Sequence, residues 1–208
     1  MDFTQYPFSL PVFNKPDFLL KFPTPVTFLV GENGSGKSTL LEAIALANNF
    51  NPSGGSRNNF YESVKTESSL ANELKLIWNK KVNQGFFMRA ETFFNFASEL
   101  DKLKKGFAGG NSYDPYGVKS LHQQSHGESF LALFNNRLNQ GLFIFDEPEA
   151  ALSPKRQLSF LAILDERVKS GDCQFIIATH SPILMSYPGA VIYEFQDGAM
   201  KKVDYRET

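Results

Sequence analysis

The residues between positions 31 and 39 have the types and the spacing that hold a phosphate group. They read Gly31-Glu32-Asn33-Gly34-Ser35-Gly36-Lys37-Ser38-Thr39 and fit the pattern G-x-x-x-x-G-K-[ST]. Glycines allow the backbone to curl until successive N–H groups converge on one anion. A helix that starts at the end of the loop adds its positive N-terminal end to the same site. The pattern therefore predicts that the chain binds a nucleoside triphosphate.

The side chains at the end of this loop have separate expected roles. Lys37 is expected to reach the β- and γ-phosphates, and the Ser38 hydroxyl is expected to bind Mg²⁺. Thr39 is expected to support the α-phosphate. The predicted nucleotide-binding residues of the loop are Asn33, Gly34, Ser35, Gly36, Lys37, Ser38 and Thr39. A glycine-rich turn that binds nothing is the alternative, and the apolar segments on both sides of the loop disfavour it.

Two carboxylates follow an apolar segment much later in the chain. Residues 142–145 read as a buried strand, and Asp146 and Glu147 come directly after it. Ligands of a parallel sheet bind at the carboxyl ends of its strands. We expect Asp146 to hold the Mg²⁺ shell and Glu147 to orient or deprotonate the attacking water. A surface turn with two acids is the alternative, which the upstream loop and Pro148 disfavour.

One histidine follows a second apolar segment in the same way. Residues 175–178 read as another buried strand, and His180 lies two positions beyond it. A neutral imidazole at this place can hydrogen-bond a γ-phosphate oxygen or the attacking water. His180 is therefore the second candidate catalytic residue, beside Glu147. The alternative is a histidine with an ordinary structural hydrogen bond at a strand end.

An α/β sheet has to position these side chains. Residues 25–30 read as a strand before the loop, and residues 40–47 read as a helix after it. A helical pattern at 154–168 separates the two later apolar strands, so those strands are expected to be parallel. The chain is predicted to close with a hairpin that turns at Gln196-Asp197-Gly198, between strands at 191–195 and 200–205.

Other segments complete the predicted fold. Residues 2–28 alternate apolar stretches with proline and polar residues, which predicts an N-terminal antiparallel β subdomain of two or three short strands. Its aromatic residues Tyr6, Phe8 and Phe13 are expected to pack in the core, with stacking on the base as the alternative. A helix is expected to start at Ser68-Ser69, because Leu70, Leu74, Ile77 and Trp78 share helical spacing, and Trp78 is expected to pack in the core. A strand is expected at 85–90.

The totals limit the class of protein. A chain of 208 residues fits one domain, 1–208, and a net charge of −1 gives no general attraction to nucleic acid. The single Cys173 excludes an internal disulfide and suits a reducing compartment. No apolar run approaches the roughly 20 residues that cross a bilayer, and the N-terminus lacks the design of a secretory signal. We therefore expect a soluble, cytoplasmic protein.

Five motifs occur in an order that resembles a known family. They are the loop at 31–39, Gln124-Ser125-His126-Gly127-Glu128, the strand end at 142–147, Ala151-Leu152-Ser153-Pro154 and His180. This order resembles the ATP-binding cassette (ABC) ATPases: Walker A, signature, Walker B, D-loop and switch histidine. The signature segment departs from the transporter form L-S-G-G-Q. It looks more like the soluble branch that includes DNA-repair and chromosome-structure ATPases and small predicted ATPases.

The resemblance implies a fold, two cofactors and further site residues. It implies a P-loop NTPase with a mostly parallel core sheet at about 25–60 and 140–208 and an inserted helical subdomain at about 92–138. The cofactors would be ATP and Mg²⁺. Ser125 and Gly127 match the family positions that contact the γ-phosphate of the opposite subunit's ATP; a plain helix N-cap is the alternative. Glu91 would take the place of the family's Mg²⁺-contacting glutamine, or be an exposed glutamate at a helix start.

The resemblance also implies an activity and a partner. The leading hypothesis is a Mg²⁺-dependent ATPase that forms ADP and phosphate and acts as a head-to-tail, ATP-dependent homodimer. The alternative is a nucleotide-gated interaction module that controls a nuclease, a toxin or a nucleic acid and turns over little ATP by itself. A transporter motor is a third possibility, which the departure of the signature from the transporter form disfavours.

Overall fold

The structure is a computed structural model that describes residues 2–15, 18–52, 69–80, 83–90, 131, 134 and 140–208. Most of the expected helical insert at 92–138 lies outside these residues. The same is true of three predicted site residues, Glu91, Ser125 and Gly127. The remaining candidate site residues are all described.

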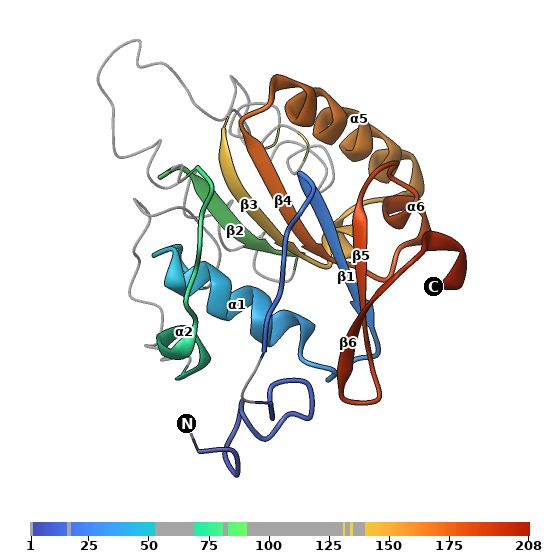
Figure 1. Ribbon diagram of the computed structural model, residues 1–208. Helices are drawn as coiled ribbons and strands as arrows, with labels where there is room; N and C mark the ends of the chain where they lie inside the picture. Colours follow the sequence, from blue (N-terminus) through green and yellow to red (C-terminus); the bar gives the residue numbers. More distant parts are fainter. Residues whose placement is uncertain are drawn as a thin grey trace, which may run out of the picture.

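Six strands of the described residues form one sheet in the order β2-β3-β4-β1-β5-β6 (Figure 1). They are β1 (Val26–Gly31), β2 (Gly85–Arg89), β3 (Gly141–Asp146), β4 (Cys173–Ala178), β5 (Val191–Gln196) and β6 (Ala199–Val203). The strands from β2 to β5 in this order pair in parallel, and β6 is antiparallel to β5. The prediction of a mostly parallel sheet is therefore confirmed.

Helices cover both faces of this sheet (Figure 1). They are α1 (Lys37–Ala47), α2 (Ser69–Glu73), α5 (Pro154–Ser170) and α6 (Pro182–Met185), with short 3₁₀ helices η2 (Pro148–Ala151) and η3 (Tyr205–Glu207). α1 and α2 pack on one face, and α5 and α6 pack on the other. No helix among the described residues is long and apolar enough to span a lipid bilayer.

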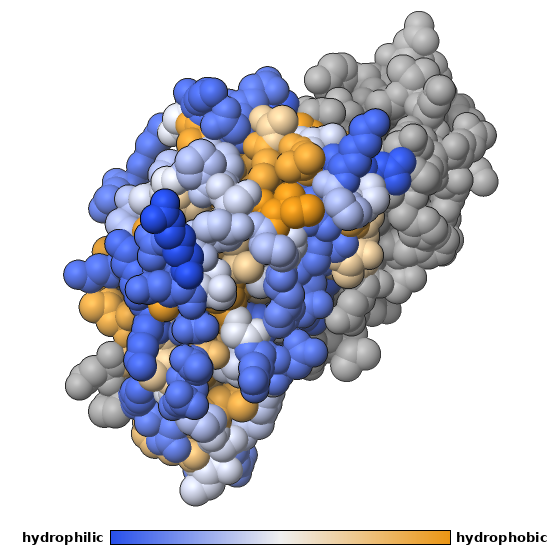
Figure 2. All heavy atoms as spheres, turned by 90° about the vertical axis from the view of Figure 1, so that its right-hand side faces the viewer, coloured by the Kyte–Doolittle hydropathy of each residue, from blue (hydrophilic) through white to orange (hydrophobic). Residues whose placement is uncertain are grey.

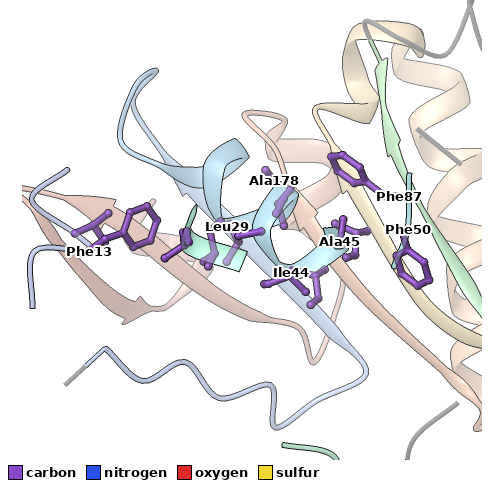
Figure 3. Packing of buried hydrophobic residues seen from close by; sticks show 14 of the residues in the cluster. Phe13, Leu29, Ile44, Ala45, Phe50, Phe87 and Ala178 are labelled. Carbon is purple, nitrogen blue, oxygen red and sulfur yellow. The ribbon is translucent and has the colours of Figure 1, made fainter. Parts of the chain in front are cut away.

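Alternate residues of the central strands supply the two faces. In β1, Phe28 packs toward α5, whereas Leu29 packs toward α1. Figure 3 shows Leu29 and Ala178 of the sheet against Ile44 and Ala45 of α1. Burial on both faces explains why these strands read as continuous apolar runs in the sequence.

Phenylalanine rings fill much of the α5 side of the sheet. The ring of Phe145 lies edge-to-face against those of Phe134 and Phe160, with centroids 4.9 and 5.6 Å away. Phe143 stacks on Phe175 at 5.4 Å. Several of the 21 phenylalanines of the chain thus form a packed aromatic core on the α5 side of β3, the strand that ends at Asp146.

The hairpin at the end of the chain is also confirmed. β5 and β6 pair antiparallel, with Gln196 opposite Ala199. Asp197 and Gly198 between them both have positive φ, 51° and 67°. Two positive φ angles are typical of the turns that match the twist of paired strands. Figure 2 shows the face of the molecule on this side, where hydrophilic residues surround a small number of apolar patches.

The predicted N-terminal antiparallel β subdomain is wrong. Residues 2–15 form successive turns, and the described residues contain no strand before Val26. Local hydrogen bonds hold these turns, such as the one from the Asn14 N–H to the Leu10 carbonyl at 3.0 Å. Prolines at 7 and 11 lack the N–H that a sheet ladder needs. The apolar residues Phe8 and Phe13 still pack beneath α1.

The helix expected to start at Ser68-Ser69 and to include Leu74, Ile77 and Trp78 is also mostly wrong. α2 ends at Glu73, and residues 74–78 are not helical. Ile77 is 83% exposed, whereas Trp78 packs partly against the α1 side of the core. A single helical turn has few internal hydrogen bonds, so tertiary packing decides how far it extends.

Candidate nucleotide-binding site

The predicted phosphate-binding loop connects the centre of the sheet to the first residue of α1. β1 ends at Gly31 and α1 begins at Lys37, three positions earlier than the sequence pattern predicted. The helix starts early because Gly36 adopts a left-handed φ of 105° and its carbonyl accepts the Leu40 N–H at 2.9 Å. The first turn of α1 therefore presents its N–H groups, which have no partner within the helix, at the end of the loop.

Gly31 and Gly36 are required for two different reasons. Gly31 has φ 134°, and a Cβ at this position would lie 2.4 Å from the Phe195 carbonyl oxygen of the neighbouring strand. Gly36 lies against Val12 and Phe13, and a Cβ there would come within 3.1 Å of both side chains. The first glycine thus allows strand pairing, and the second allows the loop to close over the N-terminal turns.

The Lys37 side chain is folded back on its own loop. Its Nζ donates hydrogen bonds to the carbonyls of Gly31 and Glu32 at 2.6 and 2.8 Å. The residue is only 4% exposed. Burial lowers the pKa of the Lys37 ammonium, and nearby carboxylates, with Glu147 the strongest, act in the opposite direction. A cation is therefore held beneath the loop by oxygen atoms of the protein.

Two of the three residues predicted to hold Mg²⁺, Ser38 and Asp146, are in contact. The Ser38 hydroxyl donates to Asp146 Oδ1 at 3.0 Å, although 108 positions separate the two residues. Asp146 is buried at the end of β3. Burial raises the pKa of the Asp146 carboxyl, whereas the charge of Arg89 and the hydrogen bond from Ser38 lower it.

Arg89 is a residue of this site that the sequence analysis missed. It is the last residue of β2 and lies directly opposite Asp146 in the sheet. Its Nε donates to Asp146 Oδ2 at 3.2 Å, and its Nη2 donates to Glu42 Oε2 of α1 at 2.8 Å. The guanidinium also lies 5.3 Å from the centre of the Phe87 ring. The signal available in the sequence was a cation at the end of a strand predicted next to the Asp146 strand.

The two predicted catalytic residues also lie close together. His180 Nε2 is 3.7 Å from Glu147 Oε1, and both side chains are partly exposed. The Glu147 N–H donates to the Ala178 carbonyl of β4 at 3.0 Å. Glu147 has a left-handed φ of 51°, a conformation that is unfavourable for a residue with a Cβ and is often found at functional sites.

Tyr6 is the one N-terminal aromatic residue outside the core. Phe8 and Phe13 are buried, as expected, but the expectation of core packing is wrong for Tyr6, which is 69% exposed. Its hydroxyl forms a 2.9 Å hydrogen bond with the Thr39 hydroxyl, and either group can donate. An exposed aromatic ring therefore lies beside the first turn of α1.

The residues present fit a triphosphate with Mg²⁺. The Ser35 hydroxyl inside the loop is buried and makes no hydrogen bond with the described residues. Such an unpaired buried donor is costly unless a ligand satisfies it, and a phosphate oxygen is a suitable acceptor. The Ser38 hydroxyl and the Asp146 carboxylate are the hard oxygen donors that Mg²⁺ prefers, and Mg²⁺ needs only one or two carboxylates when substrate phosphates complete its shell.

Models of known protein families match most of the chain. A model described as an AAA domain matches residues 12–147, more than half of the sequence. A second model, described as an AAA domain of a provisional AbiEii toxin in a type IV toxin–antitoxin system, matches residues 123–186. A curated protein of Sulfurisphaera tokodaii, provisionally named an ABC transporter ATP-binding protein, is 24% identical over 187 residues. The match covers 83% of this chain and 38% of that relative, so the chain spans well under half of the relative's length.

Solved structures share the fold. The chain resembles CbiO1 of Clostridium perfringens, part of an ABC transporter complex, with 20% identity and a TM-score of 0.51 over 91% of this chain and 80% of that one. It resembles an SMC head bound to the C-winged helix domain of ScpA, with 16% identity, a TM-score of 0.50 and coverage of 88% and 91%. It also resembles an ATP-binding cassette of an ABC transporter in its ADP conformation. The identity is 18% and the TM-score is 0.50, over 88% of this chain and 81% of that one.

Proposed function

Because the chain belongs to the family described as an AAA domain, whose model matches residues 12–147, we propose that it binds ATP with Mg²⁺ and hydrolyses it to ADP and phosphate. The observation that carries this proposal is the meeting of Ser38 with Asp146 beside Glu147 and His180. These residues come from the carboxyl ends of two parallel strands, β3 and β4, and from the first turn of α1, where α/β proteins bind ligands. The spacing of the motifs alone did not require such a meeting.

The proposed reaction uses this chain's residues to hold phosphate and to move one proton. Lys37 exchanges its carbonyl partners for phosphate oxygens, and the loop N–H groups hold the β-phosphate. Glu147 accepts a proton from the water that attacks the γ-phosphorus, the bond to the β–γ bridging oxygen breaks, and ADP leaves. His180 hydrogen-bonds a γ-phosphate oxygen. Mg²⁺, when bound by Ser38 and Asp146, supplies charge that offsets the negative charge developing on the phosphates.

The proposed active form is a head-to-tail homodimer. Ser125 and Gly127 would contact the γ-phosphate bound by the partner, and Glu91 would contact Mg²⁺ and the attacking water. Ser125, Gly127 and Glu91 lie outside the described residues. The support for the proposed dimer is therefore the order of the motifs along the chain. A match to an SMC head fold and to ABC cassettes is compatible with the same arrangement.

A nucleotide-gated interaction module is the second candidate. The observation that favours it is the family model named for a toxin of a toxin–antitoxin system, which matches residues 123–186 and so includes the predicted signature and Walker B segments. In that case ATP binding would control a nuclease, a toxin or a nucleic acid. Net turnover would then stay low until the partner is added.

Phosphate release separates these two candidates. With saturating ATP and Mg²⁺, we expect the purified chain to release phosphate steadily, and a chelator in excess of Mg²⁺ to stop this release. Isothermal titration calorimetry on the same sample measures ATP binding independently. Tight ATP binding without phosphate release would contradict the ATPase proposal and favour the module. Absence of both would contradict nucleotide binding itself.

We propose that Tyr6 packs against the nucleoside part of ATP. Its hydroxyl bond to Thr39 places the ring next to the helix turn expected to hold the α-phosphate. We expect Tyr6→Ala to weaken ATP binding about 5- to 150-fold, since stacking of a base on an aromatic ring is worth about 1–3 kcal/mol. Tyr6→Phe keeps the ring, so it is expected to stay within about threefold of the original affinity. Equal affinities of Tyr6→Ala and the unmodified chain would contradict this placement.

A further inference from the structure

Two residues that follow β3, one in η2 and one in α5, hold the segment that carries His180. Glu149 Oε1 in η2 accepts the backbone N–H of His180 at 2.6 Å. Eight positions further on, in α5, Gln157 Oε1 accepts the Ser181 hydroxyl at 2.5 Å. Two consecutive residues, His180 and Ser181, are thus bound to one stretch of chain that begins at the catalytic candidate Glu147.

The second of these points is a fully connected buried network. Gln157 and Ser181 are both 7% exposed. The amide of Gln157 also donates to the Leu152 carbonyl at 3.1 Å. The Ser181 N–H donates to the Thr179 hydroxyl at 3.0 Å, and the Ser181 hydroxyl accepts the Leu184 N–H at 3.3 Å. Movement of this segment would leave buried polar groups unpaired, so the network fixes the backbone on the far side of His180.

The His180 side chain has little other support. It is 43% exposed, and its Nε2 faces Glu147 Oε1 at 3.7 Å. Packing therefore does not fix the imidazole, and its direction depends on where the backbone of residue 180 is held. Glu149 holds that backbone directly, through the His180 N–H.

A purely structural role does not explain why residue 149 is a carboxylate. A neutral oxygen could also accept the His180 N–H, but hydrogen bonds to an ionised acceptor are roughly twice as strong. The second oxygen, Glu149 Oε2, is buried and has no hydrogen-bond partner among the described residues. A buried carboxylate oxygen without a partner costs stability, and natural proteins keep such groups mainly where function requires them.

We propose that Glu149 is a positioning residue that holds His180 opposite Glu147 during ATP hydrolysis, with Gln157 and Ser181 as the second anchor. This inference rests on the proposed ATPase function. It implies that Glu149 affects the hydrolysis step and leaves nucleotide binding unchanged, because its contact is with the His180 backbone. It also implies that Glu149 has no effect on the rate once the imidazole has been removed.

A double-mutant cycle of Glu149→Ala and His180→Ala tests both implications. We expect Glu149→Ala alone to lower kcat about tenfold with an unchanged KM for ATP. In the His180→Ala background, the same change is expected to have no further effect, because residues that act as a unit are not additive. Glu149→Gln keeps an acceptor oxygen but loses the charge, so its kcat is expected to lie between those of Glu149→Ala and the unmodified chain. The exposed helix residue Glu166 supplies the matched control, Glu166→Ala, with unchanged kcat.

Amide NMR of the nucleotide-free protein tests the contact without any activity. A short N–H···O⁻ bond moves the amide proton downfield and slows its exchange with solvent. We expect the His180 amide signal at low field in the unmodified chain, and an upfield shift with faster exchange in Glu149→Ala but not in Glu166→Ala. The His180→Ala variant, which changes the signal of position 180, supports its assignment.

The outcomes distinguish this inference from the proposed function. An active chain in which Glu149→Ala keeps full kcat overturns the positioning role alone. An equal loss of kcat in both backgrounds, or a KM that rises while kcat stays constant, also overturns it. A chain with no turnover at all overturns the ATPase proposal, and the positioning role with it.

Discussion

Glu147→Gln is expected to lower the rate of ATP hydrolysis by about 100-fold or more while ATP still binds. The amide has nearly the size of the carboxylate, but it cannot accept a proton from water. Glu147 lies at the edge of the site, 3.7 Å from His180, and Lys37 makes its hydrogen bonds to loop carbonyls instead. The substitution therefore removes the proposed base and keeps the phosphate-binding loop. Single-turnover phosphate release and calorimetric ATP binding, measured side by side, give the two halves of the result.

The same variant tests the proposed dimer. If hydrolysis normally separates the subunits, a chain that binds ATP without cleaving it should accumulate as a dimer. We expect light scattering of Glu147→Gln with ATP and Mg²⁺ to give twice the monomer mass, and Glu166→Gln to behave like the unmodified chain. A monomer at every protein concentration with saturating ATP would contradict the head-to-tail model and leave the hydrolysis result standing.

The sheet was predictable because its central strands are buried on both faces. Continuous apolar runs at β1, β3 and β4 can be recognised without an alternating pattern, and the motif residues show which end of each run faces the ligand. The parallel order of β3 and β4 followed from the helix between them. Ser38, in the first turn of α1 after β1, and Asp146, at the end of β3, meet at this carboxyl edge although β4 lies between β1 and β3.

The parts that were not predictable depend on tertiary contacts. Residues 2–15 alternate like strands, but they pack as turns because their apolar side chains reach the α1 side of the core from a non-extended backbone. Ile77 shares helical spacing with Leu70 and is nevertheless exposed. Arg89 carries no motif, and its place in the site follows only from its register opposite Asp146. Register between strands far apart in sequence is the information that a single sequence lacks.

The network around Arg89 joins the sheet to α1 at the candidate Mg²⁺ site. Asp146 Oδ1 accepts Ser38, and Asp146 Oδ2 accepts Arg89, which in turn binds Glu42. The charged side chains of Asp146, Arg89 and Glu42 are all partly or wholly buried. Salt therefore screens their charges less than it screens surface charges. The Asp146 carboxylate thus has its direction set before any ligand arrives, which is the preorganisation that electrostatic catalysis requires.

Lys37→Ala is expected to weaken ATP binding about 100-fold or more. Two hydrogen bonds from a charged group to phosphate oxygens are worth about 1.5–3 kcal/mol each, and 2.8 kcal/mol already corresponds to a factor of about 100. The loss is increased by the surroundings, because Asp146, Glu147 and Glu149 all lie near the ammonium. Without Lys37 these carboxylates would face a triphosphate of the same sign, and the loop N–H groups alone would have to offset the repulsion.

Two further lysine variants, Lys155→Ala and Lys37→Met, test whether the loss of ATP affinity is specific to the charge of Lys37. Lys155→Ala removes an exposed lysine of α5 and is expected to leave the affinity for ATP unchanged. Lys37→Met keeps most of the buried volume, so it separates loss of charge from loss of packing, and it is expected to weaken binding as much as Lys37→Ala. Circular dichroism checks that each variant is folded. Full ATP affinity in folded Lys37→Met would contradict the prediction. It would show that the Lys37 ammonium only binds the loop carbonyls and does not contribute its charge to triphosphate binding.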